Sequence, residues 1–317
     1  MVDHTLEPDA RAFADATSKP PYLTDLGVDG ARELLDQVQS SPTTKPDVDA
    51  EWISVPADVG QVRVRIVKPV GSAAALPVVL YVHGGGWVLG NAGTHDRLVR
   101  EIAVSVDAAI VFVEYDRSPE VRHPVAVEQV YATARWIMNE GATKGLDASR
   151  LAIAGDSVGG NMAAVVAILA KRRGDVTFIH QSLYYPVTDA GQDTDSYREF
   201  AEGFHLRADA MAWFWDSYLP NLDARKDVTA SPLQASIDDL KGLPETLLVV
   251  DENDVLRDEG EAYGRKLIEA GVRTTLVRYD ATIHDFMMLN PLRTSAASTS
   301  AIEQAVRTLR QAFATAN

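Results

Sequence analysis

The sequence of 317 residues contains no cysteine. A chain without thiols cannot form disulfides, use a thiolate nucleophile, or bind zinc or an iron–sulfur cluster through cysteine, whatever its compartment. Any catalytic nucleophile must therefore carry oxygen or nitrogen.

Clusters of basic residues and long apolar runs are also missing. The formal net charge is -15, and no Lys/Arg run is present, which argues against a nucleic-acid partner because phosphate binding needs clustered positive charge. No apolar run approaches the length of a membrane span, and residues 1–11 are acidic without the apolar segment of a secretory signal. We therefore expect a cytoplasmic protein with no membrane span.

Strand-like and helix-like patterns alternate through most of the chain. The hydrophobic share of 46% and the charged share of 24% suit a large globular core. The strand candidates are residues 51–56, 62–69, 77–82, 108–115, 150–154, 177–184, 245–250 and 273–279. The helix candidates between and after them are residues 94–105, 124–139, 158–172, 257–269 and 297–314. The first two strands suggest an antiparallel pair, and the alternation that follows predicts an α/β fold with a mostly parallel, doubly wound sheet.

Two segments stand outside this alternation. Residues 1–50 contain two short helical patterns separated by a Pro-Pro break and are more typical of a lid than of a core. Between residues 187 and 243, a polar connection surrounds an aromatic-rich stretch. An insertion of this length between two strands usually has a function beyond connecting them.

The stretch G-D-S-V-G-G-N, residues 155–161, lies between a predicted strand and a predicted helix. G-x-S-x-G in this setting is the pattern of a nucleophile elbow, in which glycines allow a sharp turn that exposes the Ser157 hydroxyl above the sheet. The alternative is a glycine-rich turn whose serine caps the helix. The strand–turn–helix context favours a nucleophile.

A second glycine-rich stretch, H-G-G-G-W at residues 83–87, directly follows the strand at 77–82. Consecutive glycines let backbone N–H groups converge on the oxyanion of a tetrahedral intermediate. The candidate oxyanion-hole residues are Gly84, Gly85, Gly86 and Val158. A phosphate-binding loop is excluded because Asn91-Ala92 stands where Lys-Ser/Thr is required.

Three histidines follow Ser157 and could serve as its base. His180 lies within a predicted strand, where a core or surface role is expected, and His205 lies in the aromatic insertion. His284 follows the last strand at the carboxyl edge, where such sheets place their sites, and is the favoured base.

The third member of a triad would be a carboxylate at the end of the preceding strand. D-E-N-D-V-L-R-D-E-G offers Asp251, Glu252 and Asp254, and position alone does not choose among them. A calcium-binding EF-hand loop is excluded because Val255 occupies a ligand position and the turn glycine is missing.

These stretches together resemble the hormone-sensitive lipase family of esterases within the α/β-hydrolase superfamily. The matching motifs, which run in the family's order over nearly the whole chain, are H-G-G-G-W, Y-D-R-S-P-E at 115–120, G-D-S-V-G-G-N, Y-P-V-T-D at 185–189, D-V-L-R-D-E-G at 254–260 and I-H-D-F at 283–286. The resemblance implies that Asp254 is the catalytic acid. It also implies an eight-stranded α/β-hydrolase core, residues 51–187 and 222–317, under a helical cap formed by residues 1–50 and 188–221.

Several positions depart from the family's usual pattern, among them Asp116 and Arg117, which stand where an arginine usually precedes an apolar residue. Val158 stands in place of a common alanine after the nucleophile, and Ala281 and Asp285 stand where glycines are frequent around the histidine. None of these changes removes a triad atom, so they bear on activity level and acyl size rather than on the chemistry.

The expected function is a serine carboxylesterase that hydrolyses short- to medium-chain acyl esters through Ser157, His284 and Asp254 and an acyl-enzyme, without metal or organic cofactor. The candidate substrate contacts are Trp87, Asp156, Tyr185, Phe204, Leu206, Phe214 and Trp215. The expected partner is a small hydrophobic ester, with a homodimer as the candidate assembly. An amidase, deacetylase or acyltransferase could use the same triad, whereas a non-enzymatic binding module is disfavoured because His284 is present.

Overall fold

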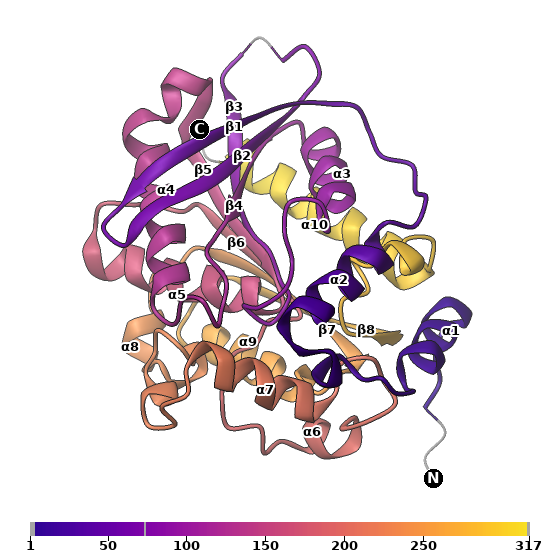
Figure 1. Cartoon of the computed structure of the whole chain (residues 1–317). Helices are drawn as coiled ribbons and strands as arrows, with labels where there is room; N and C mark the ends of the chain where they lie inside the picture. Colours follow the sequence, from indigo (N-terminus) through magenta and orange to yellow (C-terminus); the bar gives the residue numbers. More distant parts are fainter. Residues whose placement is uncertain (1–3, 73, 316–317) are drawn as a thin grey trace.

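A computed structural model describes residues 4–72 and 74–315 and contains one eight-stranded sheet (Figure 1). The strands are β1 (Val48–Ala57), β2 (Gly60–Pro69), β3 (Leu76–Val82), β4 (Ala109–Glu114), β5 (Leu146–Asp156), β6 (His180–Tyr184), β7 (Glu245–Asn253) and β8 (Thr274–Ile283). Their order across the sheet is β1-β2-β4-β3-β5-β6-β7-β8. β1 pairs with β2 and β2 with β4 antiparallel, and the remaining neighbours are parallel, which confirms the predicted fold class.

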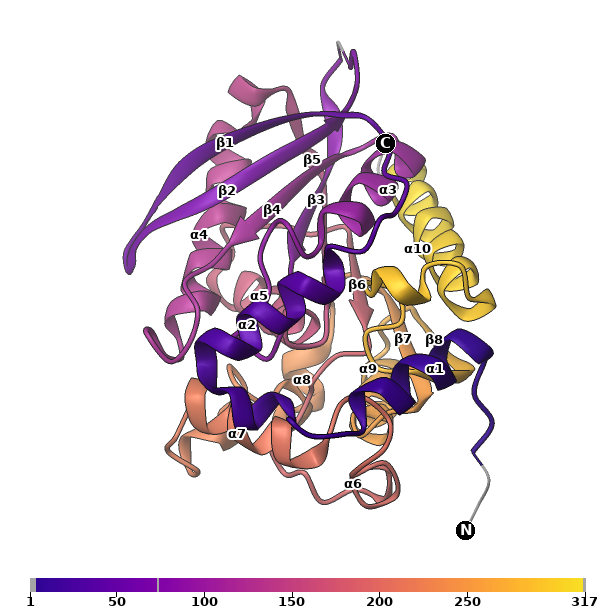
Figure 2. The same cartoon turned by 45° about the vertical axis from the view of Figure 1, so that its right-hand side comes forward.

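Helices cover both faces of the sheet, as a parallel sheet requires. One face carries α3 (Asp96–Val106) and α10 (Ala296–Thr315), and the other carries α4 (Val125–Glu140), α5 (Val158–Arg173) and α9 (Arg257–Glu269) (Figures 1 and 2). Every residue of β3 and β6 is buried. The two faces form separate apolar cores, and the continuous apolar run of β3 follows from burial on both sides.

The remaining helices gather at one end of the molecule. They are α1 (Pro8–Thr17), α2 (Gly27–Gln39), α6 (Asp195–Glu199), α7 (Ala208–Tyr218) and α8 (Ile237–Leu240). Short 3₁₀ turns elsewhere in the described chain are Leu23–Leu26, Gly141–Lys144, Ala224–Lys226, Pro232–Gln234 and Asn290–Leu292. Both views place α1 and α2 in the same half as α6 and α7, away from β1 and β2 (Figure 2). The turn Leu23–Leu26 contacts both α2 and α7, so the two segments outside the α/β alternation meet in space.

Polar side chains fix α2 to the rest of the chain. The Arg32 guanidinium donates to the carbonyl of Val88 at 2.9 Å and to both oxygens of Glu120 at 2.7 and 2.8 Å. Gln39 Nε2 donates to the carbonyls of Thr94 at 2.6 Å and Met288 at 2.9 Å. The helix is therefore held at its middle and at its carboxyl end.

The strand boundaries differ from the sequence-based prediction by up to four residues; β5, for example, begins at Leu146 instead of residue 150. β6 begins at His180 instead of residue 177. β8 continues to Ile283, because after a register shift its end pairs with Asn253 of β7. His284 consequently follows its strand directly.

None of the helices in residues 4–72 and 74–315 combines the length and hydropathy that crossing a membrane would require.

Gly159 lets the first turn of α5 approach β3. A Cβ at this position would lie 2.1 Å from the Val82 carbonyl oxygen, which is backbone and cannot move aside cheaply. We expect Gly159→Ala to lower the free energy of unfolding by about 3 kcal/mol, as overpacking of a core does. Gly141→Ala, where the nearest atom would lie at 3.3 Å, is the control and should change stability by less than about 1 kcal/mol. Equal effects in urea unfolding would contradict this account.

Candidate active site

Ser157 lies between β5 and α5 with φ 54° and ψ -121°, a conformation that residues with side chains rarely adopt. Three hydrogen bonds hold this backbone. The Ser157 N–H donates to the Tyr184 carbonyl at 2.8 Å, and the Ser157 carbonyl accepts from the N–H groups of Asn161 at 3.1 Å and Val187 at 3.2 Å. These hydrogen bonds hold the strained backbone in place, as is usual at functional sites.

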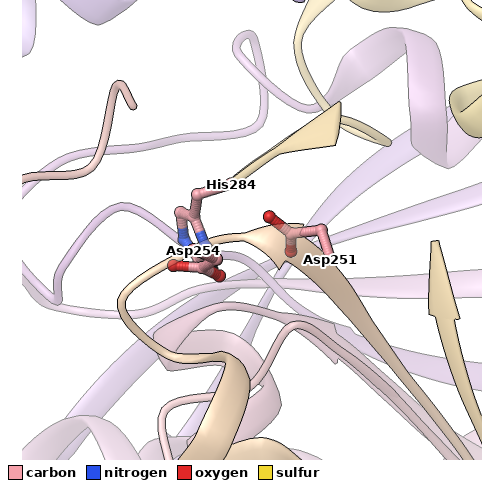
Figure 3. Close-up of side chains that lie close together, drawn as sticks. All are labelled: Asp251, Asp254 and His284. Atoms are coloured by element: carbon pink, nitrogen blue, oxygen red, sulfur yellow. Dashed lines mark hydrogen bonds and ion pairs between the residues drawn. The ribbon is translucent and has the colours of Figure 1, made fainter. Parts of the chain in front are cut away.

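The Ser157 hydroxyl begins a chain of two side-chain hydrogen bonds. His284 Nε2 lies 2.9 Å from Ser157 Oγ, and His284 Nδ1 lies 2.7 Å from Asp254 Oδ2. Asp254 Oδ1 accepts from the Leu256 N–H at 3.0 Å. All three side chains are buried, and Figure 3 shows the Asp254 carboxylate against the imidazole. The arrangement has the connectivity of a serine–histidine–aspartate triad.

Carboxylates determine the protonation of His284. Burial alone would lower the pKa of His284, but the negative charges of nearby carboxylates, Asp254 and Asp285 foremost, outweigh burial and raise that pKa. An imidazole among carboxylates is well suited to receive a proton, because the imidazolium is stabilised.

The loop that carries His284 contains two residues in left-handed backbone conformations. Ala281 has φ 60° and Asp285 has φ 66°, which glycine adopts more readily and which accounts for the family's glycines at these positions. The Asp285 carboxylate lies 3.5 Å from His284 Nε2 and 3.9 Å from His205 Nε2. Burial would raise the pKa of Asp285, but the nearby histidines, His284 foremost, lower it.

The buried Arg97 of α3 supports the segment after His284. Its Nη2 donates to the carbonyls of Met287 at 2.8 Å and Met288 at 2.7 Å, and its Nε donates to Asn290 Oδ1 at 3.0 Å. These bonds give the Met287 carbonyl a partner and add a second donor, besides Gln39 Nε2, to the Met288 carbonyl.

The H-G-G-G-W stretch forms a tight turn beside Ser157. Gly85 and Gly86 have φ of 105° and 61°, and a Cβ on Gly86 would meet the ring of Phe214 at 2.1 Å. Within the described chain, the N–H groups of Gly85, Gly86 and Val158 donate to no acceptor. The Gly84 N–H differs, because it donates to Asp156 Oδ2 at 3.1 Å.

Asp156 joins the nucleophile turn to this stretch. Besides the Gly84 N–H, its carboxylate accepts from Tyr81 Oη at 2.8 Å and lies 3.1 Å from His95 Nε2. Burial would lower the pKa of His95, but the Asp156 charge outweighs burial and raises it. Asp156 therefore faces inward as a structural link, away from the space above Ser157.

A cavity of about 360 Å³ opens above Ser157. Its floor includes Ser157, His284, Gly85 and Gly86, and its walls are mostly apolar. Of the seven residues predicted to contact substrate, the lining includes Leu206 and Phe214. Wall residues that the sequence interpretation did not single out are Phe13, Tyr22, Leu34, Leu35, Val38, Met211 and Leu289. The apolar spacing of Leu34, Leu35 and Val38 on one helix face is the signal that could have indicated them.

The other predicted contacts lie behind the cavity wall. Trp87 is fully buried and stacks on Tyr218, with ring centroids 4.1 Å apart, and it also packs against Trp215 at 4.7 Å. The Tyr185 ring packs edge-on against His284 at 5.0 Å, and Phe204 packs against Phe200. The large aromatic side chains thus serve mainly to pack the insertion onto the core.

Val158 also faces away from the cavity. Its side chain is fully buried in the core on the α5 side of the sheet, and it is not among the cavity-lining residues. The expectation that this valine trims the pocket therefore finds no support in its position.

Of the two other candidate bases, His180 is buried within β6, 2.9 Å from Ser182 Oγ, and burial lowers its pKa to about 4. His205 lies at the cavity wall opposite Asp285. Neither is bonded to Ser157.

The ligand atoms of Asp251, Asp254 and His284 lie within 4.8 Å of one another, close enough for a metal ion, but both nitrogens of His284 already make hydrogen bonds.

Comparison with known proteins agrees with this fold. The profile of the α/β-hydrolase fold matches residues 79–288. Carboxylesterase NlhH of Mycobacterium tuberculosis is 38% identical over 264 residues, 82% of this chain and 82% of that protein. A putative α/β hydrolase of Acanthamoeba polyphaga mimivirus is 38% identical over 306 residues, 96% of this chain and 88% of that protein. The crystal structure of a thermostable esterase from Pseudomonas putida superposes with a TM-score of 0.95 at 43% identity and 98% coverage of both chains.

The fold and the buried Ser–His–Asp chain define an α/β hydrolase. By its motifs and its relatives, the protein belongs to the hormone-sensitive lipase family within that superfamily.

His180 makes a pH-dependent contribution to stability that does not depend on catalysis. Its folded-state pKa lies below the ordinary value of 6.5, so the unfolded chain binds the proton more tightly and stability falls as pH drops from 6.5 toward 4. Between pH 7 and pH 4.5, the free energy of unfolding measured in urea should fall by about 2 to 3 kcal/mol less in His180→Gln than in the wild type. Identical losses in the two proteins would contradict a neutral, buried His180.

Proposed function

We propose that the protein is a carboxylic ester hydrolase that uses Ser157, His284 and Asp254 as its catalytic triad. The observation that carries the proposal is the continuous hydrogen-bonded chain from Ser157 Oγ through His284 to Asp254 at the floor of an apolar cavity. The relatives support ester hydrolysis over other acyl-transfer reactions, because they are named as a carboxylesterase and esterases.

In this mechanism, Ser157 Oγ attacks the ester carbonyl carbon while His284 Nε2 removes the hydroxyl proton. The imidazolium then delivers that proton to the leaving alcohol, which yields an acyl-enzyme. Water repeats the same two steps and frees the acid. Asp254 keeps the Nδ1 proton in place and stabilises the imidazolium, which is the role of the carboxylate in such triads.

The oxyanion is bound by the N–H groups of Gly85, Gly86 and Val158. Two observations support this assignment. These N–H groups donate to no acceptor within the described residues, and Gly85 and Gly86 lie at the cavity floor. Loss of one such donor typically costs about 100- to 1,000-fold in rate. The Gly84 N–H is bound to Asp156, so we assign Gly84 the role of fixing the turn.

We further propose that residues 1–50 and 188–221 form a cap over the core of residues 51–187 and 222–317. In support, the cavity walls come from α1, α2 and α7 as well as from the turns of the core. Mostly apolar walls around a space of about 360 Å³ suit short- to medium-chain acyl groups. The homodimer and the cytoplasmic location expected from the sequence stay predictions.

Replacement of the nucleophile tests the triad directly. We expect Ser157→Ala to lower kcat for p-nitrophenyl butyrate by at least about 10⁴-fold, because the covalent route is removed. Ser149→Ala, an exposed serine at the far end of β5, should retain wild-type turnover. Substantial turnover by Ser157→Ala, with the rate proportional to enzyme concentration, would refute the proposed nucleophile.

Phe214 is expected to limit acyl length, because its ring lies over Gly86 and lines the cavity. Phe214→Ala should raise kcat/KM for p-nitrophenyl octanoate relative to the acetate by about fivefold or more, since pocket contacts discriminate on this scale. Leu222→Ala, at a side chain 68% exposed, is the control and should leave the ratio unchanged. An unaltered ratio in Phe214→Ala would place the acyl chain elsewhere.

A further inference from the structure

A second carboxylate, Asp251, lies next to the triad and has no role in the mechanism described above. It belongs to β7, is fully buried, and points toward Asp254 and His284 (Figure 3). One oxygen of Asp251 lies within 4.8 Å of both the Asp254 carboxylate and the His284 imidazole. Neither Asp251 oxygen receives a hydrogen bond from any donor in residues 4–72 and 74–315.

The groups around Asp251 come from three further loops. Asp254 follows β7, His284 and Asp285 follow β8, and Tyr185 follows β6. The Tyr185 hydroxyl is also buried without a partner. The surroundings thus contain two other carboxylates and a single imidazole, with no lysine or arginine among the charges that act most strongly on Asp251.

Two carboxylates in one dry site cannot both be charged at low cost. Asp254 is the better place for the negative charge, because it accepts hydrogen bonds from His284 and from the Leu256 N–H. Asp251 has no comparable donor, and burial, followed by the charge of Asp254, raises the pKa of Asp251 well above its usual range.

We propose that Asp251 is a positioning residue that stays protonated while the enzyme works and donates its proton in a hydrogen bond to the Asp254 carboxylate. This inference rests on the proposed esterase function. The neutral acid would orient Asp254 without adding a second full charge beside the imidazole.

The charge state of Asp251 matters for the base. Each ionised carboxylate near His284 raises the pKa of His284, and a histidine that stays protonated cannot accept the proton of Ser157. A neutral Asp251 removes one of the three negative charges and lets His284 titrate at lower pH.

The test compares the acid limb of the kcat/KM–pH profile, which reports the protonation of His284 in the free enzyme, in the wild type and two asparagine variants. Asp251→Asn replaces a neutral acid with a neutral amide, so the limb should move by less than about 0.3 pH unit. Asp285→Asn is the matched control, because it removes a charge 3.5 Å from His284 and should shift the limb downward by about one unit. A comparable downward shift in Asp251→Asn would show that Asp251 is ionised and would overturn the proposal.

A second comparison tests the hydrogen bond itself. Asp251→Val removes the donor, and we expect its kcat/KM to lie about tenfold below that of Asp251→Asn, whose amide can donate to Asp254. Equal values for the two variants would overturn the positioning role.

Infrared spectroscopy tests the protonation of Asp251 without an activity assay. The proposal can therefore still be refuted if the valine variant fails to fold or if the wild type hydrolyses no ester. At pH 7 the wild type should show a carbonyl band of a buried protonated carboxylic acid that Asp251→Asn lacks. Glu259, which is also buried and whose pKa burial also raises, is present in both proteins and cancels in their difference spectrum. Absence of that band in the wild type would refute a protonated Asp251. Its presence without any esterase activity would instead refute the proposed function alone.

Discussion

The strained backbone at Ser157 is the constraint on which the rest of the site depends. A positive φ at a residue with a side chain is tolerated because β5, α5 and the loop after β6 hold it through three backbone hydrogen bonds. The close approach requires glycine at 155 and 159, whose absent side chains would collide with backbone atoms of α5 or β3. Ser157, the proposed nucleophile, is therefore placed by the packing of the central strands and α5, before any partner side chain contributes.

Most polar contacts around this turn join buried side chains to one another and to nearby backbone groups, and so fix the backbone of the site. Asp156 connects Tyr81, the Gly84 N–H and His95, so the residue beside the nucleophile also sets the geometry of the oxyanion turn. Arg97 performs the equivalent task for the segment after His284 by binding its carbonyl groups. In both cases a buried charge is satisfied by several partners, which is the condition under which such groups are tolerated in a core. Asp251 departs from this rule, and protonation accounts for the departure.

Motifs with a local physical cause could be predicted from the sequence, whereas features that depend on side-chain direction could not. The strand–turn–helix around Ser157 and the glycines after His83 impose their own backbone geometry. Position on one loop could not distinguish Asp251 from Asp254, because the choice depends on which carboxylate faces the imidazole. Trp87 and Trp215 are predicted to contact substrate, but they pack against each other outside the cavity lining. That Leu34, Leu35 and Val38 line the cavity could not be predicted without knowing where α2 lies on the core.

The central claim is that one serine, held by one strained turn, forms a covalent acyl-enzyme. Its most direct test is to treat the wild-type protein with a p-nitrophenyl phosphonate and locate the adduct by peptide mass spectrometry. The account predicts a single adduct on Ser157, formed together with loss of esterase turnover. An adduct on a different residue that accompanies the loss of turnover, or full turnover in protein modified at Ser157, would contradict it.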